Sequence, residues 1–233
     1  MSFFILIVLS TLIGYLFGSI PFALIIGKLF CKVDVRNYGS HNLGTTNVAR
    51  TLGPRVALIV LILDASKSAI SSLIMFNIAK NTLNNSLFIG IIFCLTGFMA
   101  AIGHCFPIFA KFRGGKAVAT IFGFLLISNY RIGLIGLAIW LIIIFYKRIV
   151  SLASIITSFI VAILIFIPFF NVAYPYLNEY LQANYFVYPI TILSLATLLI
   201  IRHLSNIKRL INHEEKVFHF GNIKNLNKDE TNK

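Results

Sequence analysis

Residues 38–50, YGSHNLGTTNVAR, gather small hydrogen-bonding side chains between two apolar segments. Gly39 and Gly44 permit backbone geometry in which successive N–H groups converge on an anion. Hydroxyl, amide and guanidinium donors accompany them, namely Ser40, Asn42, Thr45, Thr46, Asn47 and Arg50. This donor set favours phosphate binding. A capped turn leading into the next helix is the alternative, because Asn and Gly are common turn residues.

A second stretch, RGGKAVAT, places Gly114 and Gly115 before Lys116, directly ahead of an apolar run. Backbone N–H groups at the start of a helix favour an anion, and the lysine adds a full positive charge. The stretch is not a Walker A loop, which would need Gly at Ala110 and Ser or Thr at Ala117. A nucleoside-triphosphate site is therefore unsupported. The alternative is a basic membrane anchor after a flexible turn.

A third stretch, RHLSNIKRLINHEEK, carries His203, Asn206 and Arg209 at a spacing that aligns them on one helical face. Histidine can act as a general base or bind a polar substrate, asparagine can orient a hydroxyl, and arginine can hold a phosphate. The alternative is the solvated end of a helix whose basic side chains complement its dipole. We prefer that alternative for Lys208 alone.

Charged and hydroxyl side chains also occur near or within apolar segments. Asp64 and Lys67 lie one helical turn apart inside such a segment. Charges within a membrane are costly and are usually paired, so the two predict either a structural ion pair or a support behind the site. Ser151 and Ser154 begin another apolar segment. They cap a helix or reach the site, and capping is the simpler interpretation.

The remaining inventory argues against metal chemistry. The chain has seven acidic residues, with no D-x-x-D cluster to hold Mg²⁺. His104 and Cys105 are adjacent, which is poor geometry for two ligands of one zinc ion. The three cysteines are too scattered for a disulfide framework. The sequence therefore predicts binding of anionic phosphate groups with no metal and no cofactor.

The elements that position these residues are apolar segments. The chain has 233 residues, is 58% hydrophobic and 12% charged, and has a mean hydropathy of +0.90. Because a spanning helix needs about 20 apolar residues, the sequence predicts an all-α polytopic membrane protein with seven transmembrane helices. The predicted segments are 3–27, 56–76, 86–104, 117–129, 131–146, 151–170 and 185–203. The fourth and fifth are short, and their separation at SNYR is the least secure boundary.

The net charge of +13 would suit a nucleic-acid-binding protein, but the basic residues are unevenly distributed along the chain. Seventeen of the 20 follow the first, third, fifth or seventh segment. By the positive-inside rule the N-terminus is outside and the C-terminus is cytoplasmic. All three polar stretches then face the cytoplasm. We expect one integral-membrane domain over 1–218 and a polar, disordered cytoplasmic tail over 219–233.

These stretches resemble the motifs of one protein family. Residues 39–50 match G-S-x-N-x-G-x-T-N-x-x-R, 103–120 match G-H-x-F-P-x-F-x-x-F-x-G-G-K-x-V-A-T, and 203–210 match H-x-x-N-I-x-R-L. The chain is thereby similar to the bacterial acyl-phosphate-dependent glycerol-3-phosphate acyltransferases, called PlsY, over nearly its whole length. Three residues stand where the family usually has glycine: His41, Ser68 and His213. Glu215 keeps the family's glutamate spacing, whereas Lys216 arrives one residue early.

The resemblance implies transfer of a fatty acyl group from acyl phosphate to the 1-hydroxyl of glycerol 3-phosphate, giving lysophosphatidic acid and phosphate. It implies catalytic roles for Ser40, Arg50, Lys116, His203 and Asn206. Further substrate or phosphate contacts are expected from Gly39, Asn42, Gly44, Thr45, Thr46, Asn47, His104, Gly114, Gly115, Ser154, Arg209 and Glu215. Asp64 and Lys67 would support them. The base is either His203 or the phosphate of the donor.

The resemblance also implies a location and partners. The protein would be a multi-pass protein of the bacterial inner membrane, with its active site facing the cytoplasm. It would contact membrane lipids, have a functional link to the soluble enzyme that makes acyl phosphate, and bind no nucleic acid. Two other classes compete with an enzyme. A transporter of phosphorylated solutes would show repeated halves and broken helices at mid-membrane, and a non-enzymatic scaffold would need no particular chemistry at Lys116.

Overall fold

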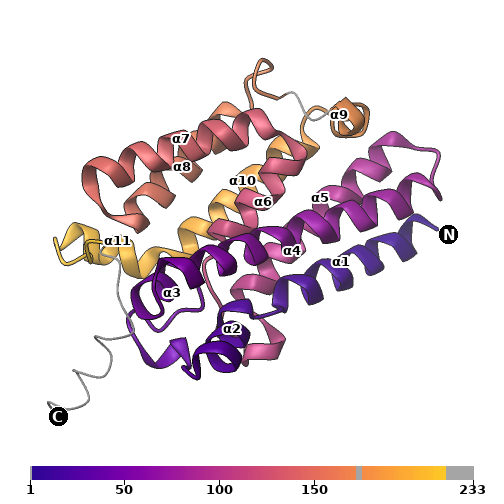
Figure 1. Ribbon diagram of the computed structural model, residues 1–233. Helices are drawn as coiled ribbons and strands as arrows, with labels where there is room; N and C mark the ends of the chain where they lie inside the picture. The colour runs from indigo at the N-terminus through magenta and orange to yellow at the C-terminus, as the bar shows by residue number, and fades with distance from the viewer. Residues whose placement is uncertain (1, 172–174, 219–233) are drawn as a thin grey trace, which may run out of the picture.

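The computed structural model describes residues 2–171 and 175–218, in which helices are joined by short loops and no strand occurs (Figure 1). The all-α class predicted from the sequence is confirmed for these residues. The predicted tail, 219–233, lies outside them.

The first predicted segment forms two helices rather than one. α1 (Phe3–Ser19) and α2 (Phe22–Cys31) are separated at Ile20 and Pro21. Proline lacks the N–H that an α-helix needs, and it disfavours helical geometry in the residue before it. The interruption places α2 next to the first polar stretch.

The later predicted segments each contain an apolar helix. They are α4 (Pro54–Lys80), α5 (Ser86–Cys105), α6 (Val118–Ser128), α7 (Tyr130–Lys147), α8 (Val150–Leu164) and α10 (Val187–Arg202). The uncertain boundary between α6 and α7 falls at Asn129, whose side chain accepts the Ile132 N–H at 3.2 Å. Asn129 therefore starts α7 with a side-chain cap.

Among the described residues, four stretches are long and apolar enough to cross a membrane: Phe3–Cys31, α4, α5 and α7. A fifth is counted if α10 is joined to α9 (Pro175–Gln182), from which it is bent by 94°. α6 and α8 are shorter apolar helices. A membrane protein is thus supported, while seven spans and the orientation of the termini stay predictions.

α9 lies between the last two predicted segments. Its Leu177 and Leu181 lie one turn apart and are buried. The helix packs against α5, where a Cβ added at Gly90 would meet the carbonyl oxygen of Tyr180. A short amphipathic pattern therefore forms a helix outside the seven predicted segments.

Small residues allow the central helices to approach closely. Cβ atoms added at Gly14 and Gly18 of α1 would meet the carbonyl oxygens of Thr96 and Ala100 on α5. Membrane helices use small residues in this way because close backbone contact provides the packing that apolar exclusion from water cannot. The outer surface instead exposes large apolar side chains, such as Phe4 at 72% and Phe145 at 78%, as a lipid-facing surface requires.

Three short helices within or next to the polar stretches gather at one end of the bundle. α2, α3 (Thr45–Thr51) and α11 (Leu204–Ile211) lie at the end opposite the N-terminus and α9 (Figure 1). Stretches far apart in sequence therefore meet at a single face.

Candidate functional site

The side chain of Asn47 organises the loop that precedes α3. Its Oδ1 accepts the Ser40 N–H at 2.7 Å. Its Nδ2 lies near three carbonyl oxygens, those of Val35 at 2.8 Å, Asn42 at 3.0 Å and Tyr38 at 3.2 Å. Asn47 is 1% exposed. Its amide, predicted to contact substrate, is thus occupied in shaping the loop.

Two residues of this loop adopt left-handed backbone geometry. Gly39 has φ +65, and a Cβ there would also meet the side chain of Asn47, so glycine is required twice over. His41 has φ 58, so the residue that stands where the family usually has glycine adopts a conformation that favours glycine. The His41 Nδ1 lies 2.8 Å from the Arg36 carbonyl oxygen and donates to it.

The other polar residues of the stretch have different surroundings. Asn42 donates to the Ser40 carbonyl at 3.1 Å, and the buried Thr45 Oγ1 has no hydrogen-bond partner among the described residues. Gly44 has φ −88 and open space where a Cβ would stand. Half-buried Thr46 lies beside them in α3. Arg50 reaches across the fold, and its Nη2 lies 3.4 Å from the Lys216 carbonyl oxygen.

The Gly114–Gly115 loop lies directly against the end of α5. The Gly115 N–H donates to the His104 carbonyl at 3.1 Å. A Cβ at Gly114 would meet that same carbonyl oxygen, and one at Gly115 would meet the His104 Nε2. Neither glycine has positive φ, so both are needed for close approach and not for backbone freedom.

Arg202 holds the other side of this loop, a role that the sequence reading missed. Its Nε and Nη2 donate to the Gly115 carbonyl at 3.3 and 3.2 Å. Its guanidinium carbon lies 4.8 Å from the centre of the Phe106 ring, a cation–π contact. The available signal was its position immediately before His203.

Lys116 connects the glycine loop to α11. Its ammonium group donates to the Asn206 Oδ1. Burial is the main cause that lowers the pKa of Lys116 to about 8, and repulsion from arginines such as Arg209 adds to it, while Glu215 opposes the shift. Near neutral pH this lysine is still mostly charged but is unusually easy to deprotonate.

The carboxylate of Glu215 fixes the orientation of Asn206. Its Oε1 accepts from the Ser151 Oγ at 2.9 Å and from the Asn206 Nδ2 at 2.8 Å, and its Oε2 accepts from the Arg209 Nε at 2.7 Å. Burial acts to raise the pKa of Glu215, but these hydrogen bonds outweigh it and lower the pKa. With Nδ2 committed to Glu215, the Asn206 Oδ1 faces Lys116.

His213 turns the chain so that Glu215 can return to α11. It has φ 59. The His213 N–H donates to the Leu210 carbonyl at 3.2 Å, and the Glu214 N–H donates to the Arg209 carbonyl at 2.8 Å. This pair of bonds is a Schellman cap, whose left-handed position usually holds glycine. The replacement of glycine at 213 therefore preserves the turn.

His203 presents one ring nitrogen without a proton. Its Nδ1 lies 2.8 Å from the Leu199 carbonyl oxygen, and a carbonyl only accepts, so Nδ1 carries the hydrogen and Nε2 keeps its lone pair. Burial, with Lys116 nearby, lowers the pKa of His203 to about 4. The imidazole is consequently neutral at physiological pH and can accept a proton.

Ser154 and His104 were both predicted to contact substrate, but their side chains do not join Lys116, Asn206 and Glu215. The Ser154 Oγ donates to the Val150 carbonyl at 2.9 Å and accepts from the Trp140 Nε1 at 3.1 Å. Ser151, interpreted as a helix cap, is the serine that reaches Glu215. The side chain of His104 lies with Asp64 and Lys67, on the other side of the glycine loop.

The residues brought together form a site suited to anions. Three basic side chains interact with the carboxylate of Glu215, namely Arg50, Lys116 and Arg209, and Arg202 adds a fourth positive charge near Lys116 and His203. The surplus of positive charge favours phosphate groups, to which charge-assisted hydrogen bonds are strong. A neutral imidazole beside them adds a group for proton transfer. We call these residues, with His203 and Asn206, the cationic cluster.

Comparisons with known proteins agree with this chemistry. Residues 8–213 match the family described as glycerol-3-phosphate acyltransferase. Glycerol-3-phosphate acyltransferase 2 of Lactobacillus acidophilus is 39% identical over 217 residues, covering 90% of this chain and 89% of that protein. The glycerol-3-phosphate acyltransferase of Enterococcus faecalis is 36% identical over 228 residues, covering 97% and 99%.

Solved structures agree as well. The glycerol 3-phosphate form of PlsY (YgiH), an integral membrane glycerol 3-phosphate acyltransferase, superposes with a TM-score of 0.75 at 33% identity, covering 91% of this chain and 96% of that one. Its lysophosphatidic acid form gives a TM-score of 0.73 at 32% identity, with coverages of 91% and 95%.

Proposed function

Because this chain belongs to the glycerol-3-phosphate acyltransferase family, we propose that it transfers a fatty acyl group from an acyl phosphate to the 1-hydroxyl of glycerol 3-phosphate. The products are lysophosphatidic acid and inorganic phosphate. The observation that carries the proposal is the surplus of positive charge around Lys116, next to a neutral histidine. Both substrates bear a phosphate group, and both phosphates need such a site.

Binding is divided between the two sides of the cluster. Arg50 and Lys116, with Ser40, hold phosphate groups, while His203 and Asn206 position glycerol 3-phosphate. Asn206 donates to Glu215 and accepts from Lys116, so it links the two halves. The Arg209 Nε is paired with Glu215, so this guanidinium both holds the carboxylate and adds positive charge to the cluster.

The reaction is one acyl transfer with no covalent enzyme intermediate. The substrate hydroxyl oxygen bonds to the acyl carbon, the bond between that carbon and the phosphate oxygen breaks, and phosphate departs. The hydroxyl proton passes either to the His203 Nε2 or to the departing phosphate. The acyl phosphate is already activated, so the protein's task is positioning and charge stabilisation.

One of the two N–H groups of the glycine loop is not available to stabilise the oxyanion of the reaction. The Gly115 N–H already donates to the His104 carbonyl. Stabilisation of the oxyanion therefore falls to the Gly114 N–H and to the ammonium group of Lys116. Such preorganised donors stabilise charge that develops during the reaction.

The cluster lies at the end of apolar helices, where a water-soluble phosphate and a lipid chain can meet. We place this face in the cytoplasm, on the basis of the distribution of basic residues. The acyl chain then lies among membrane lipids, and the acyl phosphate comes from a soluble enzyme. No cofactor and no nucleic acid take part.

The decisive experiment supplies purified protein with glycerol 3-phosphate and either palmitoyl phosphate or palmitoyl-CoA. We expect lysophosphatidic acid and stoichiometric phosphate from the acyl phosphate only. Activity with palmitoyl-CoA alone would overturn the donor assignment. Flux of glycerol 3-phosphate into liposomes without lipid synthesis would instead support a transporter.

A further inference from the structure

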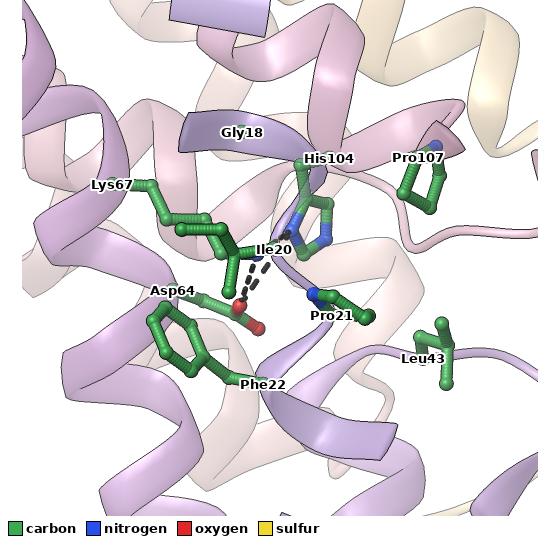
Figure 2. Close-up of a pocket in the computed structure, with 9 residues that line it drawn as sticks. All are labelled: Gly18, Ile20, Pro21, Phe22, Leu43, Asp64, Lys67, His104 and Pro107. Carbon is green, nitrogen blue, oxygen red and sulfur yellow. Dashed lines mark hydrogen bonds and ion pairs between the residues drawn. The ribbon is translucent and has the colours of Figure 1, made fainter. Parts of the chain in front are cut away.

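A second polar cluster lies behind the glycine loop, within the apolar helices α4 and α5. It consists of Asp64, Lys67 and His104, which are 1%, 3% and 6% exposed (Figure 2). The Lys67 Nζ lies 2.7 Å from the Asp64 Oδ1 and 3.3 Å from the His104 Nδ1. We call these three residues the buried cluster.

The contacts of Lys67 determine the tautomer of His104. An ammonium group has three donors and no acceptor, so the His104 Nδ1 accepts and its Nε2 carries the hydrogen. That Nε2 is the edge of the ring facing Gly115, where an added Cβ would collide with it. The charge in α4 thereby fixes which edge of the imidazole faces the loop.

His104 touches the loop by its main chain as well. Its carbonyl oxygen accepts the Gly115 N–H at 3.1 Å, while Arg202 holds the Gly115 carbonyl from the other side. Gly115 is thus clamped between two residues. The next residue along the chain is Lys116, whose ammonium group meets Asn206.

We propose that Asp64, Lys67 and His104 are positioning residues that hold the Gly114–Gly115 loop, and through it Lys116, in the geometry that acyl transfer needs. The inference rests on the proposed function. The simpler alternative is an ion pair that only ties α4 to α5. The pocket beside the cluster is lined by Leu43 and Pro107, among other residues (Figure 2), so the cluster lies where two of the polar stretches meet.

The test removes the charges together, because a single removal leaves a buried charge without its partner. In Asp64→Asn/Lys67→Met we expect a folded protein with kcat reduced about a hundredfold, the effect of a displacement of about 1 Å at a reacting group. Hydrogen exchange of residues 107–117 should become faster. Exchange of residues 86–95, in the distant half of α5, should stay unchanged.

A second variant covers the case in which the double variant fails to fold. His104→Asn keeps an acceptor near Lys67 but removes the ring edge that faces Gly115, and it should reproduce both changes. The matched control is Ser72→Ala, which removes a buried hydroxyl that has no partner among the described residues of α4. It should alter neither kcat nor exchange of the loop.

A wild-type kcat in either folded variant would overturn the proposal, as would unchanged exchange of residues 107–117. In both cases the buried cluster would only join helices. The two readouts separate this inference from the proposed function. If the wild-type protein makes no lysophosphatidic acid, the function fails, yet the exchange measurement still reports whether the cluster holds the loop.

Discussion

Two polar clusters lie on opposite sides of the same pair of glycines, and they differ in charge balance. In the buried cluster one aspartate faces one lysine, and the histidine completes the contacts. In the cationic cluster four basic side chains accompany the single carboxylate of Glu215, and three of them interact with it. Balanced charge suits a cluster that holds structure, whereas surplus positive charge leaves capacity for an anion.

The strongest test of this difference is the loss of a charge from the cationic cluster. Lys116→Ala should lower kcat/KM about a thousandfold, because it removes a donor aimed at developing charge. Steady-state phosphate release measures it. Lys208→Ala, which removes an exposed lysine of α11, should keep wild-type activity, and the melting temperature of Lys116→Ala should be nearly unchanged. Wild-type turnover in Lys116→Ala would end the assignment of the site.

The same change in the buried cluster should act on stability. Lys67→Met leaves Asp64 charged and unpaired in an apolar span, at a cost of about 3 kcal/mol. Thermal unfolding in detergent should show a large decrease in melting temperature, and Asp64→Asn in the same chain should restore most of it. Equal melting temperatures of wild type and Lys67→Met would erase the distinction between the clusters.

His203 tests whether proton transfer belongs to the protein. His203→Gln keeps polarity but removes the basic nitrogen, and kcat should fall about a hundredfold if the imidazole is the base. A decrease of less than about threefold would assign the proton to the departing phosphate. Such a decrease corresponds to a change in activation free energy of less than about 1 kcal/mol, too small for the loss of a general base. Parallel measurement of KM separates loss of binding from loss of chemistry.

The pH dependence of kcat/KM tests whether the charge of Lys116 in the cationic cluster is needed for activity. Because the pKa of Lys116 is lowered to about 8, its charge is present below that pH and is lost as pH rises through it. We expect kcat/KM to fall above pH 8 or so, about tenfold per pH unit once the lysine is mostly deprotonated. Lys116→Arg stays charged, so its lower kcat/KM should show no such fall.

The smallest expected effect concerns the turn that returns Glu215 to the site. His213 occupies left-handed geometry, with φ 59, so His213→Gly should stabilise the protein by about 1 kcal/mol. Thermal unfolding checks the increase. Activity should remain at the wild-type level, since the Schellman cap itself is unchanged. A loss of stability would show that the His213 side chain contributes contacts that outweigh the strain.

The sequence predicted the helices well because apolar length and periodicity are local properties. It predicted the meeting of Lys116 and Asn206 less directly, through motifs and topology. It did not predict the role of Arg202, whose partner is a main-chain carbonyl at residue 115, because every residue type offers that group. It did not decide whether Ser151 caps a helix or reaches the site, since the spacing of serines does not reveal a glutamate 64 positions away.

The departures from glycine illustrate a different limit. Histidine stands at 41 and 213, where the family usually has glycine, and both histidines adopt positive φ. The sequence shows which residue is present but not whether nearby contacts offset the strain. At His41 the contact is a hydrogen bond from the ring to the Arg36 carbonyl.

The contact between Ser151 and Glu215 joins residues far apart in sequence. This separation has a consequence for when the contact can form during synthesis of the chain. Ser151 and Arg50 are made early, but the carboxylate that orients Asn206 and the carbonyl that accepts from Arg50 are contributed by residues 215 and 216. The chain is made from its N-terminus, so the membrane helices are synthesised before these contacts can form. These contacts can therefore form only after α11 and the turn that follows it have left the ribosome.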